Sequence, residues 1–173
     1  MAVISWGIPK IFVKDLDGAQ TSNPWVKLPT PVEDSTQLET TKGDKLEAKI
    51  EGGENEDVRI KRSTYALMLN IRKAKNRTAP IPSVDGVVEH HYAVMLQPED
   101  PTCPGFSIDL STVSVVDSYN AADGAMWEIQ FDALKPKIGA TVKWGVVTAT
   151  GNELEGYEVT IETADNGIET VTP

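Results

Sequence analysis

The stretch from Ser107 to Leu134 decides the fold, and it reads SIDLSTVSVVDSYNAADGAMWEIQFDAL. Residues 107–118 and 125–134 are rich in β-branched and aromatic side chains, which favour strands. Between them, Asn120–Gly124 ends in an Asp-Gly pair, a strong signal for a tight turn. Apolar and polar residues then alternate from Trp127 to Asp132. The stretch therefore predicts an antiparallel hairpin with one face in a core and the other in water.

The same period of two recurs along the chain. It is found at Lys45–Glu51 and Tyr157–Glu162, which we predict to be strands with one solvated face, and at Tyr65–Arg72 and Tyr92–Gln97, which we predict to be more deeply buried strands. The segment Tyr65–Lys75 also fits a helical spacing, but the alternation favours a strand.

One short segment predicts a helix instead. Ser83–Glu89 follows Pro82, and Ser83 can cap a helix there. We therefore expect an all-β, mostly antiparallel fold, a β-sandwich or small barrel with one short flanking helix.

The length of 173 residues fits a single β-rich domain. Within it we expect an N-terminal arm and edge strands over residues 1–30, a core sandwich over 31–150, and a C-terminal strand and tail over 151–173. The segment 20–31 contains three prolines, which favours an extended loop or an edge piece.

The charge and the single cysteine exclude several classes of function. The formal net charge of −10 argues against gripping nucleic acid or an anionic membrane, because both require clustered Lys and Arg. A negative surface would instead let DNA pass without sticking. Cys103 is the only cysteine, so no disulfide can form within the chain, and we expect a structural cysteine in a protein made in the cytoplasm.

We find no catalytic centre, metal site or cofactor motif in the sequence. His90 and His91 are neighbours on a predicted strand, so they point to opposite faces, and we expect one to be partly packed and the other exposed. Asp15–Gly18 is interpreted as a turn. The acidic segment Glu51–Asp57 could hold a hard cation, but its two glycines favour a solvated loop.

The remaining functional feature is a polar hairpin predicted over Thr36–Gly52, with Lys42-Gly-Asp44 at its tip. Exposed strand edges of this kind recruit other strands. The alternative is an ordinary solvated hairpin.

Two pairs of segments in this chain resemble the tail tube proteins of tailed phages and prophages. The first pair is Pro31–Glu54 and Arg62–Arg72, with a polar strand pair, a Glu-Gly-Gly turn and a Thr-Tyr-x-Leu strand; the second is Ala121–Pro136 and Val142–Val147. The resemblance covers most of residues 30–150, whereas the strand at 157–162 and the tail after it match nothing in the family.

The resemblance implies a structural protein of a virion tail, made in the host cytoplasm, without catalysis. It implies a β-sandwich with a short helix, hexameric rings that stack into a tube, contacts with other tail proteins, and DNA that passes without specific binding. Contacts between copies are then expected at the predicted hairpin and the acidic loop. The residues concerned are Thr41, Lys42, Gly43, Asp44, Lys45, Glu51, Glu54, Glu56 and Asp57.

Two other classes stay open at this point. One is a β-sandwich module that binds carbohydrate or a protein partner. The other is a small hydrolase that uses two carboxylates, since the separation of carboxylates is a property of the fold.

Overall fold

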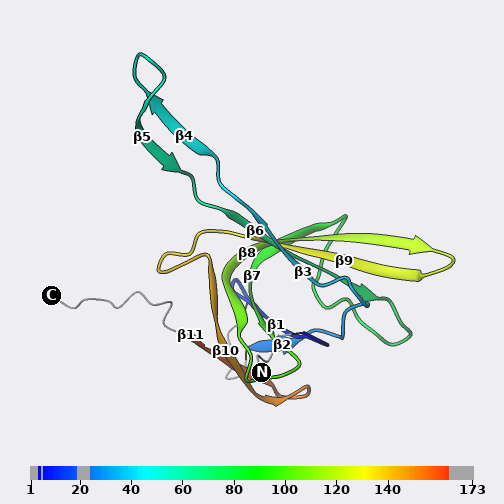
Figure 1. Ribbon diagram of the computed structural model, residues 1–173. Helices are drawn as coiled ribbons and strands as arrows, with labels where there is room; N and C mark the ends of the chain where they lie inside the picture. The colour runs from blue at the N-terminus through cyan, green and yellow to red at the C-terminus, as the bar shows by residue number, and fades with distance from the viewer. Residues whose placement is uncertain (1–3, 5, 19–23, 164–173) are drawn as a thin grey trace.

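The computed structural model describes residues 4, 6–18 and 24–163, and these form an all-β fold (Figure 1). The parts of the predicted N-terminal arm at residues 1–3, 5 and 19–23, and the tail from residue 164, lie outside the described residues. The strands are β1 (Lys10–Asp15), β2 (Trp25–Lys27), β3 (Gln37–Thr41), β4 (Lys45–Lys49), β5 (Asn55–Ile60), β6 (Thr64–Arg72), β7 (Val87–Gln97), β8 (Gly105–Asn120), β9 (Gly124–Ala133), β10 (Val142–Asn152) and β11 (Gly156–Thr163).

Nine of these strands form one sheet, in the order β10-β11-β2-β1-β7-β8-β9-β6-β3. A further pairing of β10 with β8 closes the first part of this sheet into a ring of the strands β10, β11, β2, β1, β7 and β8. The strands β9, β6 and β3 extend from the ring. The fold is therefore part barrel and part open sheet, and it is antiparallel in every pairing.

Strand β8 joins the two parts because its length lets it serve two partners along one edge. Its first residues, Gly105–Ile108, pair with β10, and its remainder from Ser111 onwards pairs with β9. A side chain at Gly105 would not fit, since a Cβ there would lie 2.1 Å from the carbonyl oxygen of Leu96. The predicted hairpin of residues 107–134 is confirmed as β8 and β9, with Asn120 opposite Gly124.

Two apolar clusters form the core, on opposite faces of β1 and β7. Ile11, Val13 and Val94 belong to the larger cluster, which also includes residues of β6, β8 and β9. Phe12 and Met95 point the other way, into a cluster drawn from the strands of the ring. The faces of β10 and β11 turned away from the second cluster carry exposed threonines and glutamates. The second cluster therefore fills the inside of the ring, and the larger one covers its outer face toward β6 and β9.

The strands β1 and β2 lie inside the sheet and not at an edge, contrary to the prediction for residues 1–30. β1 pairs with β2 on one side and with β7 on the other, and β2 also contacts β11. The sequence Ile11-Phe12-Val13 is apolar at three consecutive positions, which is typical of a strand buried on both faces.

The short helix predicted over Ser83–Glu89 is wrong. Val84–Val87 form a tight turn in which the N–H of each donates to the carbonyl oxygen of the other, at 3.0 and 2.9 Å. The two central residues, Asp85 and Gly86, have φ angles of 51° and 80°. Positive φ at both central positions defines the hairpin turn favoured by Asp-Gly, so local turn chemistry overrides the helix cap at Ser83.

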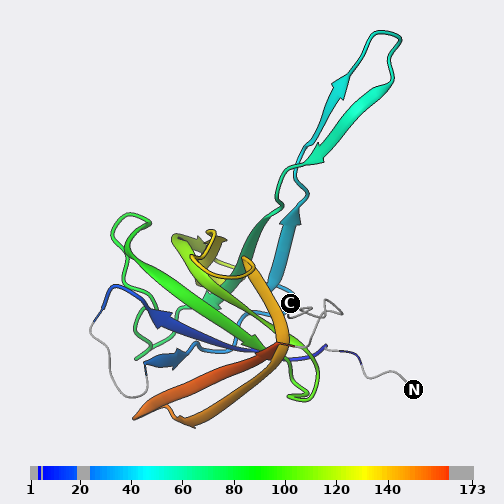
Figure 2. The same cartoon turned by 90° about the vertical axis from the view of Figure 1, so that its left-hand side faces the viewer.

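Strands β4 and β5 form a separate two-stranded sheet that projects from the body (Figures 1 and 2). We call residues 44–61 the arm. At its base the N–H of Lys61 donates to the carbonyl oxygen of Asp44, at 2.9 Å. Gly43 lies just below this bond, and a Cβ on it would come within 1.9 Å of the carbonyl oxygen of Lys61. The two chain segments thus meet closely where the arm leaves the body.

Candidate interaction surface

The predicted hairpin of residues 36–52 does not form, because β3 and β4 pair with different partners. β3 pairs with β6, with Thr41 opposite Thr64, whereas β4 pairs with β5. The Lys42-Gly-Asp44 segment, expected at a hairpin tip, is the connection at the base of the arm. The sequence pattern gives two strands separated by a turn-like tripeptide, but it does not say which strands hydrogen-bond.

The nine residues predicted to make contacts therefore fall at three places. Thr41 ends β3, and Lys42–Lys45 lead into β4. Glu51 and Glu54 lie in the turn at the tip of the arm, where the N–H of Ile50 donates to the carbonyl oxygen of Glu54 at 3.0 Å. Glu56 and Asp57 lie in β5 and not in a solvated loop, which corrects the interpretation of Glu51–Asp57. All except Gly43 are exposed.

Every residue of β4 and β5 is exposed, which contradicts the expectation that one face of Lys45–Glu51 lies in a core. Leu46, Ile50, Val58 and Ile60 are between 41% and 63% exposed. Alternation correctly predicted the strand, but it cannot reveal what covers the apolar side chains. The dense charges around these aliphatic residues were the one available signal that the segment leaves the body.

The two faces of the arm combine ions with aliphatic side chains in the same way. Residues directly opposite each other in an antiparallel pair point to one face. Lys45 is opposite Ile60 and Glu47 is opposite Val58, whereas Leu46 is opposite Arg59 on the other face. Neither face is purely polar, so the arm presents apolar groups to solvent on both sides.

Ion pairs within the arm lie along each strand. Nζ of Lys45 is 2.7 Å from Glu47 and that of Lys49 is 3.6 Å from the same carboxylate. The hydrogen bond from Lys45 lowers the pKa of Glu47, and the charge of Lys45 adds to this effect. Arg59 Nε is 3.2 Å from Asp57. Exposed pairs of this kind contribute little to stability, so they do not explain why the arm extends into solvent.

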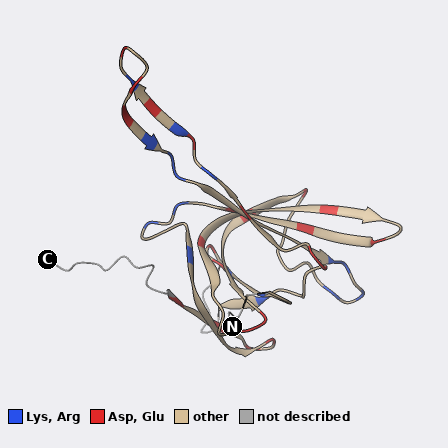
Figure 3. Cartoon of the chain, viewed as in Figure 1, with Lys and Arg blue, Asp and Glu red and all other residues tan. Residues whose placement is uncertain are grey.

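Charge is unevenly distributed from the tip of the arm along β5, whereas β4 alternates lysine and glutamate. Residues 51–57 at the tip carry four carboxylates and no cation, whereas residues 58–62 near the base carry Arg59, Lys61 and Arg62 and no carboxylate. Figure 3 shows blue on β5 toward the body, whereas red and blue alternate along β4. No group of three or more possible metal ligands occurs among the residues that the structure describes, the acidic tip included.

A free strand edge lies near the base of the arm. The strand order of the large sheet ends at β3, whose outer edge has no partner strand in the described part of the chain. The neighbouring edge of β6 is covered, since the N–H of Val32 donates to the carbonyl oxygen of Asn70 at 2.8 Å. The exposed edge is thus confined to Gln37–Thr41.

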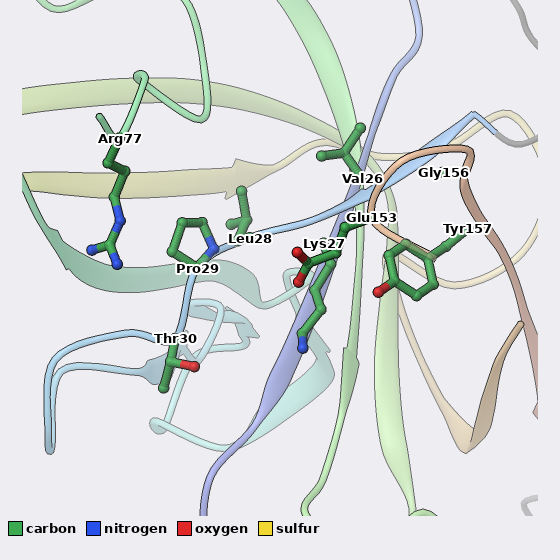
Figure 4. Close-up of a pocket in the computed structure, with 9 residues that line it drawn as sticks. All are labelled: Val26, Lys27, Leu28, Pro29, Thr30, Arg77, Glu153, Gly156 and Tyr157. Atoms are coloured by element: carbon green, nitrogen blue, oxygen red, sulfur yellow. The ribbon is translucent and has the colours of Figure 1, made fainter. Parts of the chain in front are cut away.

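The body also has clefts, and one of about 440 Å³ lies where β2 meets the turn between β10 and β11 (Figure 4). Figure 4 shows Glu153 beside Lys27, with Arg77 apart from them on another loop. One carboxylate beside a lysine does not provide the two-carboxylate arrangement of a hydrolase.

The described residues also contain no helix long and apolar enough to cross a membrane.

Cys103 is buried, and desolvation raises the pKa of its thiol, with the nearby Asp100 adding to the effect. A thiol with a raised pKa is a poor nucleophile.

The two histidines are both exposed, which contradicts the expectation that one of them is packed.

Both histidines contact aspartates, His90 one at the end of β1 and His91 one in the turn after it. His90 Nδ1 lies 2.7 Å from Asp15 Oδ2, and His91 Nδ1 lies 3.1 Å from Asp17 Oδ2, which also accepts the N–H of His91. The hydrogen bond that His90 donates to the Asp15 carboxylate raises the pKa of His90, and the charges of Asp15, Asp17 and Glu89 act in the same direction. The hydrogen bonds from His91 lower the pKa of Asp17.

These pairs predict a pH-dependent contribution to stability. The raised pKa of His90 means that its pair stabilises the fold below the ordinary pKa of histidine and is lost as pH rises through the raised value. The contribution of Asp17 to stability is lost at low pH, as the pH falls through the lowered pKa of its carboxyl group. We expect His90→Gln to lower the melting temperature at about pH 5.5 and to change it much less at about pH 8.5. Calorimetry at both pH values measures this, and an equal loss at both would contradict a charged pair.

Comparisons with known proteins find similarity in structure and none in sequence. No family model matches the sequence, and no curated protein matches it. Among solved structures, the chain is similar to the sheath/tube terminator of an extracellular contractile injection system (PVC), determined by cryo-EM in the extended state. The TM-score is 0.48 and the sequence identity is 15%, and the match covers 77% of this chain and 96% of that chain.

Proposed function

We propose that the protein is a structural subunit that assembles with copies of itself through the arm, as a component of the tail tube type. The observation that carries the proposal is the projecting β4–β5 sheet with aliphatic residues exposed on both faces. An isolated two-stranded hairpin is marginally stable in water. Contact with another copy would cover both its apolar side chains and its free edges.

The arm offers enough apolar surface to matter energetically. Full burial of an aliphatic side chain contributes about 1.5–3 kcal/mol, so the four half-exposed residues Leu46, Ile50, Val58 and Ile60 contribute roughly 3–6 kcal/mol per arm before the cost of association. Assembly into a ring multiplies the number of such contacts. This supports a weakly associating subunit that becomes stable in a larger assembly.

The finer architecture in this proposal is a hexameric ring that stacks into a tube. A ring requires heterologous contacts, in which one surface of a copy meets a different surface of the next. The free edge of β3 and the arm are two different surfaces that could meet in this way. Other tail proteins would be the partners at the ends of the tube.

The net charge supports a conduit for DNA. A formal charge of −10 per chain repels phosphate, so DNA would move through a tube of such subunits without adhering to it. The proposal needs no catalytic residue and no cofactor.

Electron microscopy tests the proposal directly. Negative-stain images and multi-angle light scattering of the full chain, over a range of concentrations, should show rings or short tubes and masses at multiples of the monomer. Sulfate salts should promote them, because such salts strengthen apolar association. A strict monomer under all these conditions would overturn the proposal, and retention of a sugar on a glycan array would favour a binding module.

A further inference from the structure

A second exposed apolar surface lies on the body, outside the arm and the edge of β3. It consists of Ile4 and Trp6 before β1, Pro104 before β8, and Trp144 on β10, and we call it the tryptophan surface. Trp6 is 81% exposed, and Trp144 is also exposed. Large exposed aromatic residues that occur together mark contact sites, because tryptophan dominates binding energies at protein interfaces.

The tryptophan surface has a defined shape. Trp6, Pro104, Phe106 and Trp144 line a cleft of about 220 Å³. That is larger than the cavity of roughly 150 Å³ that holds a benzene molecule, so an aliphatic side chain fits. The ring of Phe106 supports Trp144 from below, with ring centroids 5.2 Å apart. The N–H of Ile8 donates to Glu99 Oε2 at 3.0 Å and ties the segment before β1 to the β7–β8 loop.

Two carboxylates border this cleft. Glu99 and Asp100 line an adjoining hollow together with Ile4 and Trp6, and among the residues that the structure describes no lysine or arginine lines either hollow. Hydrogen bonds from the hydroxyl and N–H of Thr102, at 2.7 and 3.0 Å, lower the pKa of Asp100 and keep it ionised. The surface therefore selects an apolar group accompanied by positive charge.

The base of the arm has that composition. Ile60 is the most exposed aliphatic residue of β4 and β5, and it lies between Arg59 and Lys61 and opposite Lys45. Within the described part of the chain, no ion pair involves Lys61 or Arg62. These cations are therefore available to a partner.

The arm and the tryptophan surface lie at opposite ends of the molecule. In Figures 1 and 2 the arm extends upward, while the β7–β8 loop, which contains Glu99 and Asp100, lies in the lower part of the molecule. The two views are related by a 90° turn about the vertical axis, which leaves vertical positions unchanged, so the vertical separation is the same in both. Complementary surfaces at opposite ends cannot meet within one copy, whereas between two copies such surfaces make a head-to-tail contact.

We propose that the tryptophan surface receives the base of the arm from the next copy. Ile60 enters the cleft beside Trp6 and Trp144, and Lys61 and Arg62 meet Glu99 and Asp100. A cation over the face of Trp6 adds to this attraction. The inference rests on the proposed self-assembly and deepens it by naming the two surfaces that meet between stacked copies.

Disulfide trapping tests the contact. Two full-length variants, Ile60→Cys and Ile4→Cys, are mixed under mild oxidation, and the native Cys103 stays buried and unreactive. The mixture should give a disulfide-linked dimer at least about tenfold faster than either variant alone, because only the mixture brings the two surfaces together. A dimer that forms equally well from one variant alone indicates a symmetric contact and overturns the proposal.

A matched substitution gives an independent measurement. Trp6→Ala should raise the concentration needed for assembly roughly thirtyfold, as expected for removal of a central aromatic residue. Tyr119→Ala is the control, since Tyr119 is 80% exposed at the far end of β8 and lies outside both surfaces. Equal effects of the two substitutions would overturn the inference.

Failure of this contact is distinguishable from failure of the proposed function. If the wild type assembles and the trapped dimer is absent, self-assembly stands and the tryptophan surface is not the receptor. If the wild type does not assemble at all, the proposed function itself fails.

Discussion

Replacement of residues 45–60 by the dipeptide Asn-Gly is expected to abolish assembly and to leave the body folded. The N–H of Lys61 already donates to the carbonyl oxygen of Asp44, so the two ends that remain are adjacent. Asn-Gly forms the two-residue turn that closes such a pair of strands. Because β4 and β5 pair only with each other, the free energy of unfolding of the body should change by less than about 1 kcal/mol.

Light scattering and negative-stain microscopy measure assembly, and circular dichroism measures whether the body stays folded. Leu154→Ala serves as the control, since it removes an exposed aliphatic side chain from the β10–β11 turn and should assemble like the wild type. Assembly of the shortened chain at wild-type concentrations would show that the arm is not the contact. Loss of the β spectrum would show that the arm supports the fold of the body.

Phe12→Ala is expected to lower the free energy of unfolding by about 3–5 kcal/mol, which is a large part of the stability of a typical domain. Phe12 is 1% exposed, lies in the cluster inside the ring, and contacts Tyr157 of β11 at a ring-centroid distance of 5.2 Å. Its removal leaves a cavity between β1 and β11. Closely packed strands collapse only partly into such a space, so the loss exceeds the transfer term alone.

Urea unfolding of the full chain measures this effect. Phe12→Leu is the matched control, since it keeps most of the apolar volume and should cost markedly less. A loss below about 1 kcal/mol for Phe12→Ala would show that the inside of the ring is not part of the core. Replacement of residues 45–60 is expected to change assembly and not stability, whereas Phe12→Ala is expected to change stability.

Strands were predictable from the sequence wherever the alternation of apolar and polar residues reflects one face buried in the core. Trp127–Asp132 and Tyr65–Arg72 have one apolar side, and both are found as strands, β9 and β6, whose alternate residues reach the core. Alternation works here because side chains of a strand point to opposite faces, and a single buried face imposes the pattern directly on the sequence.

The segment Lys45–Glu51 shows the limit of that inference. Its period is as regular as that of β9, yet its aliphatic residues are exposed on the arm. Period reports that a strand has two unlike faces. It does not report whether the apolar face meets the core of the same chain, another copy, or solvent.

The sequence pattern also did not reveal which strands pair with each other. Thr41 and Lys45 are separated by three residues, a spacing typical of a hairpin, but their strands pair with β6 and β5. Hydrogen bonds between strands depend on which backbone edges come together after the chain has folded, and residue types at the turn constrain this only weakly. The same holds for Trp6 and Trp144, which are 138 positions apart in sequence and line one cleft.

The sequence by itself determined the all-β class, most strands, the β8–β9 hairpin and the acidic charge, because each of these follows from local period, turn chemistry or composition. The tertiary structure alone decided the ring closure of β8 with β10, the projection of the arm, and the position of the tryptophan surface at the opposite end. These depend on contacts between residues distant in sequence, whose free energy is a property of the packed arrangement and leaves no local pattern to read.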